Sequence, residues 1–123
     1  MVLVMTIMVK AVIFDMDGTI IKLPIEYLRL EKNLRHILKT KARITRILPA
    51  LRIASDLDGP IVQKIFNIID EEEMEAAKQL SVCDDSPTLL RTLKKQGYHL
   101  GLVTLQGRNV VNLVIKNLDL DCL

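Results

Sequence analysis

Two aspartates, Asp15 and Asp17, stand one residue apart directly after an apolar run, in AVIFDMDGTI (residues 11–20). Carboxylates this close repel each other, so the pair is stable where something uses or neutralises both charges. One carboxylate can attack phosphorus as a nucleophile while its neighbour acts as general acid and base. Because two anions would repel a phosphate, a divalent cation is also needed, and Mg²⁺ prefers one or two carboxylates together with phosphate oxygens and water.

The residues on either side of the aspartates predict where the pair lies. KAVIF (10–14) is typical of a buried parallel strand. A carboxylate at the C-terminal end of such a strand lies in the crevice where α/β sheets bind ligands. Gly18 permits a tight turn at this point, and Thr19 offers a hydroxyl.

Two other interpretations of the motif fit less well. A calcium loop starting at Asp15 would have Glu26 at its twelfth position, but Ile20 occupies the sixth, where glycine is needed. A simple turn after a strand accounts for one aspartate but not for two. The chain repeats the spacing in SDLDGP (55–60), after a helical stretch and with proline in place of threonine, which predicts a turn before a helix.

The rest of the chain predicts alternating helices and strands. Apolar residues recur at helical spacing in four segments between residues 25 and 80, the third over 61–69 and the fourth over EEEMEAAKQL (71–80). YHLGLVT (98–104) is typical of a second parallel strand, and RNVVNLVIKNL (108–118) of a last helix. This order predicts an α/β fold with right-handed crossovers.

The helix before the second strand has its own start and stop signals. Ser86 is a favourable N-cap, and Pro87 suits the first helical position. Gly97 is expected to end the helix. The predicted buried face consists of Leu89, Leu90 and Leu93.

Charge is segregated in the helical region. Residues 22–52 carry nine Lys or Arg against two Glu, whereas residues 53–86 carry nine Asp or Glu against two Lys. One interpretation is that helical hairpins present complementary charged faces. The other is that the basic half overhangs the site and attracts an anionic substrate.

Composition excludes several classes of protein. The chain has 123 residues, half of them apolar, a formal net charge of +2 and 3% aromatics, which predicts a globular domain with no nucleic-acid partner. Its apolar N-terminus is interrupted by Lys10 before the ~20 residues of a membrane span, and it lacks signal-peptide features. Cys83 and Cys122 are too few for a disulfide framework, so we expect no membrane association and a cytoplasmic location.

Two stretches resemble known motifs. VIFDMDGTI (12–20) resembles motif I of the haloacid dehalogenase superfamily of phosphohydrolases, and LGLVTLQGR (100–108) resembles its motif II. The resemblance implies a Rossmann-like parallel-sheet core built from residues 1–21 and 83–123. It also implies a helical cap inserted at residues 22–82, between the two motifs.

The resemblance also implies roles for individual residues. Asp15 would be the nucleophile that forms an aspartyl-phosphate, and Asp17 the acid and base. The Asp15 carboxylate and the Asp17 backbone carbonyl would hold Mg²⁺. Thr104, with Gly18 and Thr19, would bind the phosphate.

The activity implied is Mg²⁺-dependent hydrolysis of a phosphomonoester of a small phosphorylated metabolite, as in phosphoglycolate phosphatase. An aspartate at position 17 argues against the family's dehalogenases and P-type ATPases, which have other residues there. The substrate would depend on how cap side chains such as Arg29, Arg35 and Arg52 are aimed.

Only the first half of the family's pattern is expected in this sequence. The motif III lysine and the motif IV acids would follow LDLDCL (118–123). Two hypotheses stay open: an enzyme that takes these groups from a complementing second chain or from unrecognised residues, and an incomplete relative or fragment that acts through association. An unpaired edge on the strand at 10–14 would favour a homodimer in either case.

Overall fold

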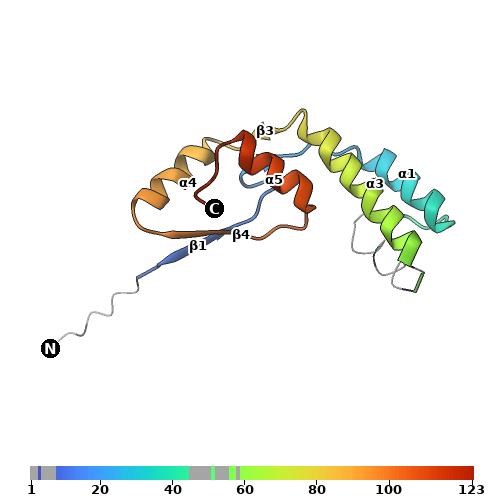
Figure 1. Cartoon of the computed structure of the whole chain (residues 1–123), viewed down its shortest axis with the longest axis horizontal. Coiled ribbons are helices and arrows are strands. Elements are labelled where there is room, and N and C mark those ends of the chain that lie inside the picture. The colour runs from blue at the N-terminus through green and yellow to red at the C-terminus, as the bar shows by residue number, and fades with distance from the viewer. Residues whose placement is uncertain (1–2, 4–7, 45–50, 52–55, 58) are drawn as a thin grey trace.

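The computed structural model describes residues 3, 8–44, 51, 56–57 and 59–123. Figure 1 shows two adjoining groups of elements: a small α/β body that contains the strands β1 and β4, and a helical arm formed by α1 and α3. In chain order the elements are β1 (Ala11–Phe14), β2 (Ile21–Lys22), α1 (Tyr27–Leu38), α3 (Gly59–Ala77), β3 (Ser81–Val82), α4 (Ser86–Lys95), β4 (His99–Leu102) and α5 (Arg108–Asn117).

The α/β body is organised around a parallel pair of strands. β1 pairs with β4, from Ala11 opposite His99 to Phe14 opposite Leu102. Helices α4 and α5 lie over one face of this pair (Figure 1). The predicted α/β class, with a Rossmann-like parallel core, is therefore confirmed.

The core of the body lies between the sheet and its helices. Val110 and Val114, one turn apart on α5, are at most 1% exposed because both face the strands and α4. The same cluster includes Met16, Ile20, Ile21, Leu90 and Leu120. On the opposite face of the sheet Ile13 is 69% exposed, so the prediction of a buried strand is wrong for β1.

A short antiparallel ribbon connects the body to the arm. Ile21 of β2 pairs with Val82 of β3, and Lys22 pairs with Ser81. The chain therefore leaves for the helical arm and returns from it at the same place. The two ends of the segment 23–80 are therefore held side by side by the pairing of β2 with β3.

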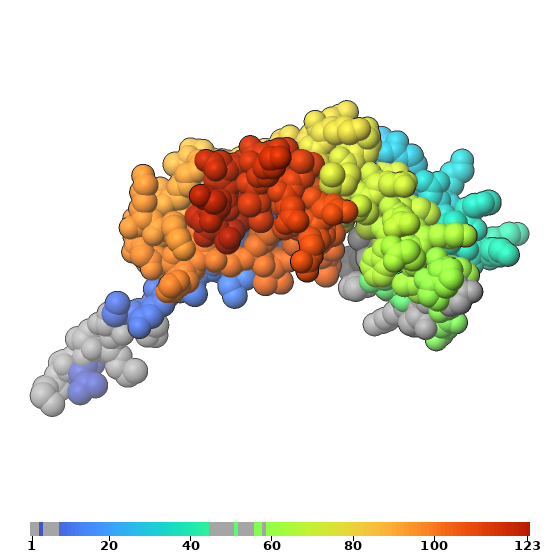
Figure 2. Space-filling view, viewed as in Figure 1, coloured from blue at the N-terminus to red at the C-terminus, as the bar shows by residue number. Residues whose placement is uncertain are grey.

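A second apolar cluster holds the arm together, where α1 packs against α3. Its buried members are Leu30, Leu34, Ile44, Ile65 and Ile69. Because α3 also contributes Ala76 and Ala77 to the cluster of the body, this one helix belongs to both cores. Figure 2 shows the arm and the body as adjoining masses, with α3 beside α5.

Helix α3 corrects one sequence prediction. The two helices expected over 61–69 and 71–80 are a single helix, Gly59–Ala77, because no glycine or proline separates them and the buried positions continue through the junction. In SDLDGP, Pro60 lies in the first turn of α3 as predicted, whereas Asp58 lies outside the described residues. Most of the second predicted helix, including Pro49, also lies outside them.

Helix α4 corrects another. Ser86 is not its N-cap: Asp85 has that position, and the buried Ser86 hydroxyl donates to the Ile20 carbonyl at 2.6 Å. Among the predicted buried residues, Leu90 is fully buried, but Leu89 is 51% exposed. Gly97 follows the helix with φ +89°, a conformation that glycine adopts without strain, so the prediction for the helix end is confirmed.

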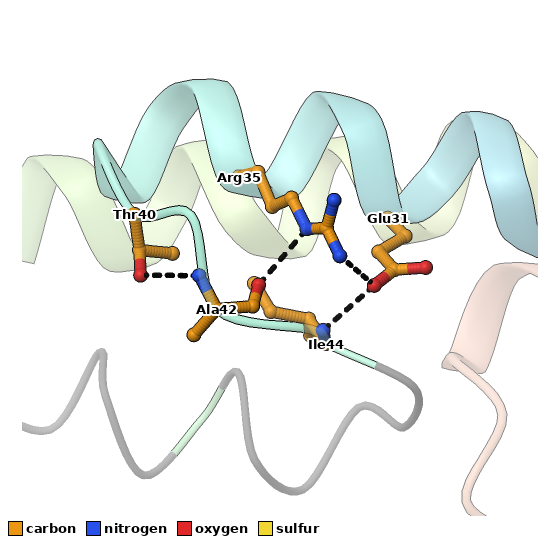
Figure 3. A network of polar contacts seen from close by, with 5 residues as sticks. All are labelled: Glu31, Arg35, Thr40, Ala42 and Ile44. Carbon is orange, nitrogen blue, oxygen red and sulfur yellow. Dashed lines mark hydrogen bonds and ion pairs between the residues drawn. The ribbon is translucent and has the colours of Figure 1, made fainter.

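Polar contacts secure the chain after α1 (Figure 3). Arg35 donates to the Glu31 carboxylate at 2.5 Å and to the Ala42 carbonyl at 2.9 Å. The same Glu31 oxygen accepts from the Ile44 amide at 2.9 Å, which helps to hold Ile44 against the arm's apolar cluster. Within the part of the chain that the structure describes, no helix has the length and apolar character needed to cross a membrane.

Candidate active site

The parallel register brings the two motifs to the same edge of the sheet. Asp15 is the first residue after β1, and Thr104 follows β4 by two residues. The Val103 amide donates to the Phe14 carbonyl at 2.9 Å, so the strand ladder reaches the point where both loops begin. Asp15, Asp17 and Thr104 accordingly line one cleft of about 460 Å³.

A tight turn follows the first aspartate. Met16 is 1% exposed, and its carbonyl accepts from the Ile20 amide at 2.9 Å. Gly18 has φ +83°, and its amide donates to the Ile21 carbonyl at 2.7 Å. A Cβ at Gly18 would meet nothing within 4 Å, so the backbone conformation is what favours glycine there.

Gly18 and Thr19 are not among the residues that line the cleft. Gly18 closes the turn through its backbone, and the Thr19 amide donates to the Met16 carbonyl at 3.2 Å. The phosphate-binding role expected for these two residues stays a prediction.

Backbone amides fix one oxygen of each aspartate. Asp15 Oδ1 accepts from the Met16 amide at 2.8 Å, and Asp17 Oδ1 accepts from the Leu23 amide at 2.9 Å. Within the described residues, no hydrogen bond to the second oxygen of either carboxylate is found, which leaves that oxygen for chemistry or for a ligand. Leu23 is buried at the point where the chain leaves the body for the arm. The orientation of Asp17 therefore depends on the position of the backbone at Leu23.

This donor set fits a magnesium ion. Asp15 and Asp17 line one cleft, where the Asp15 carboxylate and the Asp17 backbone carbonyl would be oxygen ligands of the kind that Mg²⁺ takes, with water and phosphate oxygens completing its octahedron. The described residues contain no group of three His, Cys, Asp or Glu side chains suited to a metal. The remaining ligands of a bound magnesium ion would therefore be water molecules, phosphate oxygens or groups outside the described residues.

Thr104 is tied into the loop after β4. Its hydroxyl donates to the Gln106 side-chain oxygen and accepts from the Gln106 amide at 3.2 Å. Gln106 itself lines the cleft, a contribution that the sequence reasoning missed. Its position two residues after Thr104, where a side chain can turn back on the loop, was the available signal.

A buried glutamate from the arm reaches the same loop. Glu73 of α3 is 1% exposed, and its Oε2 accepts from the Gly107 amide at 2.8 Å. Among the described residues its Oε1 has no hydrogen-bond partner. Burial raises the pKa of Glu73; the Gly107 hydrogen bond opposes this shift, while the nearby charges of Asp70 and Asp17 add to it.

Tyr27, at the start of α1, is within electrostatic range of the same acids. Its pKa is raised by partial burial, then by the charges of Asp17 and Glu73. The sequence reasoning did not single out Tyr27 or Glu73. For Glu73 a signal existed: it continues the spacing of Ile65 and Ile69, so an acid occupies a position of the buried stripe.

Two of the arginines considered as substrate contacts, Arg29 and Arg35, have other partners. Arg29 forms two hydrogen bonds to the buried Glu72, at 2.6 and 2.8 Å, which join the basic and acidic halves of the arm. Arg35 is occupied by Glu31 and the Ala42 carbonyl. Arg52 lies outside the described residues, and the described lining of the Asp15 cleft carries no positive charge.

Comparison with known proteins agrees with this geometry. No curated protein matches the chain. A model of the haloacid dehalogenase-like hydrolases matches residues 9–123, which include both strands, both motif loops and the whole arm. The chain therefore belongs to the haloacid dehalogenase-like hydrolase family.

Proposed function

We propose that the chain is a Mg²⁺-dependent phosphomonoesterase acting on a small phosphorylated metabolite. The observation that carries the proposal is the cleft in which Asp15, Asp17 and Thr104 meet at the carboxyl ends of β1 and β4. Membership of a hydrolase family supports a hydrolytic reaction. Phosphoglycolate, suggested by the sequence resemblance, is the reference substrate.

In the proposed reaction Asp15 acts as nucleophile and Asp17 as acid and base. A carboxylate oxygen of Asp15 attacks phosphorus, the bond from phosphorus to the ester oxygen breaks, and protonated Asp17 gives its proton to that oxygen. Water then attacks the aspartyl-phosphate, Asp17 takes the water proton, and inorganic phosphate leaves. A bound Mg²⁺ would offset the negative charge of the carboxylates and the phosphate.

Two further features support this assignment of roles. The Leu23 amide holds only one oxygen of Asp17, so the other can carry the proton. Thr104 offers a hydroxyl that can exchange its Gln106 partner for a phosphate oxygen. We also propose that the arm, residues 22–82, acts as a cap over the core formed by residues 1–21 and 83–123.

The test is hydrolysis of p-nitrophenyl phosphate with and without Mg²⁺. We expect Asp15→Asn to abolish turnover and Asp17→Asn to lower kcat by about 10²–10⁴-fold, as for loss of a general acid. Asp56→Asn is the matched control, since Asp56 has the same DxDG spacing at a turn before α3. Activity that survives Asp15→Asn would show that Asp15 is not the nucleophile.

A second candidate is an incomplete relative that acts through association. It is favoured by the exposed face of the sheet, where Ile13 and Val103 are 69% and 65% exposed. The described lining of the cleft also supplies two carboxylates and no cation to hold an anion. Under this proposal the partner is a second copy of the chain or a complementing chain that covers this face.

A further inference from the structure

A second cleft of about 320 Å³ lies between α3 and the beginning of α5. Leu105 lines both this cleft and the one that holds Asp15, so the two adjoin at the loop after β4. The acids of the two clefts also interact, since the charge of Asp17 contributes to the raised pKa of Glu73. A ligand bound at Asp15 that extended past Leu105 would therefore enter the second cleft.

The charged groups in the described lining of the second cleft are Asp70 and Glu73, one helical turn apart on α3. Both acids engage the start of α5: Glu73 Oε2 accepts from the Gly107 amide at 2.8 Å, and Asp70 Oδ2 accepts from the Asn109 side chain at 2.9 Å. These contacts fix the two carboxylates relative to the motif II loop. The lining is otherwise apolar or uncharged.

The absence of a side chain at Gly107 leaves room where the carboxylates converge. A Cβ there would lie 3.1 Å from Glu73 Oε2, closer than an ordinary contact, and 3.4 Å from Asp70 Oδ1. Glu73 is 1% exposed, and its Oε1 finds no hydrogen-bond partner among the described residues. A buried carboxylate oxygen without a donor is costly, so a ligand that donates to it would bind favourably.

We propose that this cleft holds the alcohol part of the phosphomonoester and selects one that carries a protonated amine, through Asp70 and Glu73. The inference rests on the proposed phosphatase function. An ammonium donates up to three hydrogen bonds and pairs with carboxylates at short distance. It would also offset the mutual repulsion that helps to raise the pKa of Glu73.

A cleft lined by Asp70 and Glu73 favours a different substrate from phosphoglycolate. The leaving group of phosphoglycolate carries a carboxylate, which would bring a third anion beside Asp70 and Glu73. An aminoalkyl phosphate brings opposite charges to the two clefts: its phosphate to the Asp15 cleft with Mg²⁺, and its amine to the acids of α3. We therefore expect amines to be preferred over neutral analogues, and carboxylates to be the poorest substrates.

The experiment compares aminoalkyl phosphates of two to six carbons with alkyl phosphates of the same length, at pH 7 with Mg²⁺. We expect at least one amine to exceed its neutral partner about tenfold in kcat/KM, equivalent to about 1.4 kcal/mol. Asp70→Asn should reduce that preference several-fold. Glu71→Gln, an exposed acid on the same helix that is not part of the lining, is the matched control and should keep the preference.

Equilibrium binding separates this inference from the proposed function. The same pairs of compounds are titrated by calorimetry into Asp15→Asn, so that turnover does not interfere. Tighter binding of an amine, lost in Asp15→Asn/Asp70→Asn, supports the inference even if the wild-type chain hydrolyses nothing. Hydrolysis of p-nitrophenyl phosphate without any preference for amines overturns the inference alone, and absence of both hydrolysis and binding overturns both.

Discussion

Asp17 is held by the backbone amide of Leu23, which lies where the chain passes from β2 toward the arm. Its hydrogen bond comes from Leu23, six residues later, where the chain leaves the short ribbon. Asp15 is fixed by the amide of its neighbour Met16. The contact that orients the proposed nucleophile thus lies within the body. The orientation of the proposed acid depends also on the segment that leads into the arm.

Functional residues could be predicted from the sequence where the residues around them are close in the chain. Asp15 and Asp17 were found because the strand, turn and acids are contiguous in sequence. Glu73 was not singled out, because its burial depends on α3 packing against the start of α5, more than thirty residues later. The roles of Gly18, Thr19 and Thr104 stay predictions.

The buried carboxyl group of Glu73 makes stability depend on pH. Its pKa is higher in the folded protein than the ordinary 4.5, so the folded state binds the proton more tightly than the unfolded state. The stability it contributes is full below pH 4.5 and is lost as pH rises through the raised pKa. We expect Glu73→Gln, which keeps an acceptor for Gly107, to raise the free energy of unfolding at pH 7 relative to wild type.

Urea unfolding of both proteins at pH 4 and pH 7 measures this effect. The gain from Glu73→Gln should be present at pH 7 and nearly absent at pH 4. Glu71→Gln removes an exposed acid from the same helix and should leave stability almost unchanged at both values. A gain that is equal at the two pH values would contradict the assignment to Glu73 ionisation.

At the scale of elements, two adjacent leucines of α4 differ in their surroundings. Leu90 is fully buried against the body's cluster, whereas Leu89 is 51% exposed. Sequence spacing predicted both as buried, because the pattern indicates a helix but does not say how much of its surface another element covers. For the same reason β1 was predicted to be buried, although Ile13 is exposed in the described structure.

The corresponding prediction uses the pair as its own control. Leu90→Ala should lower the free energy of unfolding by about 2–5 kcal/mol, through lost burial and the cavity left behind. Leu89→Ala should lower it by less than about 1 kcal/mol, since the side chain is half exposed already. Equal losses in urea unfolding would mean that both leucines are buried in solution.

In the whole molecule, as far as its residues are described, helices cover one side of the sheet and the other side is exposed. Helices α4 and α5 lie over one face (Figure 1), while Ile13, Val103 and Leu105 are 65–74% exposed on or next to the strands. Among the described residues, β1 pairs only with β4, so its other edge is open. Exposed apolar surface beside an open strand edge favours association.

We therefore expect the chain to self-associate, unless a complementing chain covers this face. Light scattering should give a mass above that of one chain that rises with concentration, and Ile13→Thr/Val103→Thr should lower it, since threonine suits a strand but is less apolar. Leu28→Gln changes an apolar residue on α1 that is 82% exposed, and it should leave the mass unaltered. A constant monomer mass for the wild-type chain would refute the expectation.

Helix α3 packs in the cores of both the body and the arm, so a tilt of this helix would move the arm relative to the body. The helix is anchored in the body by Ala76 and Ala77 at one end and carries Ile65 and Ile69 of the arm's own cluster. Its 19 residues make a lever about 28 Å long, so a tilt of roughly 10° about the anchored end displaces the far end by about 5 Å. Asp70 and Glu73 lie near the fulcrum, where the same tilt moves a side chain much less. If the arm closes over a ligand as proposed, the displacement would be large at Gly59 and small at the carboxylates of Asp70 and Glu73.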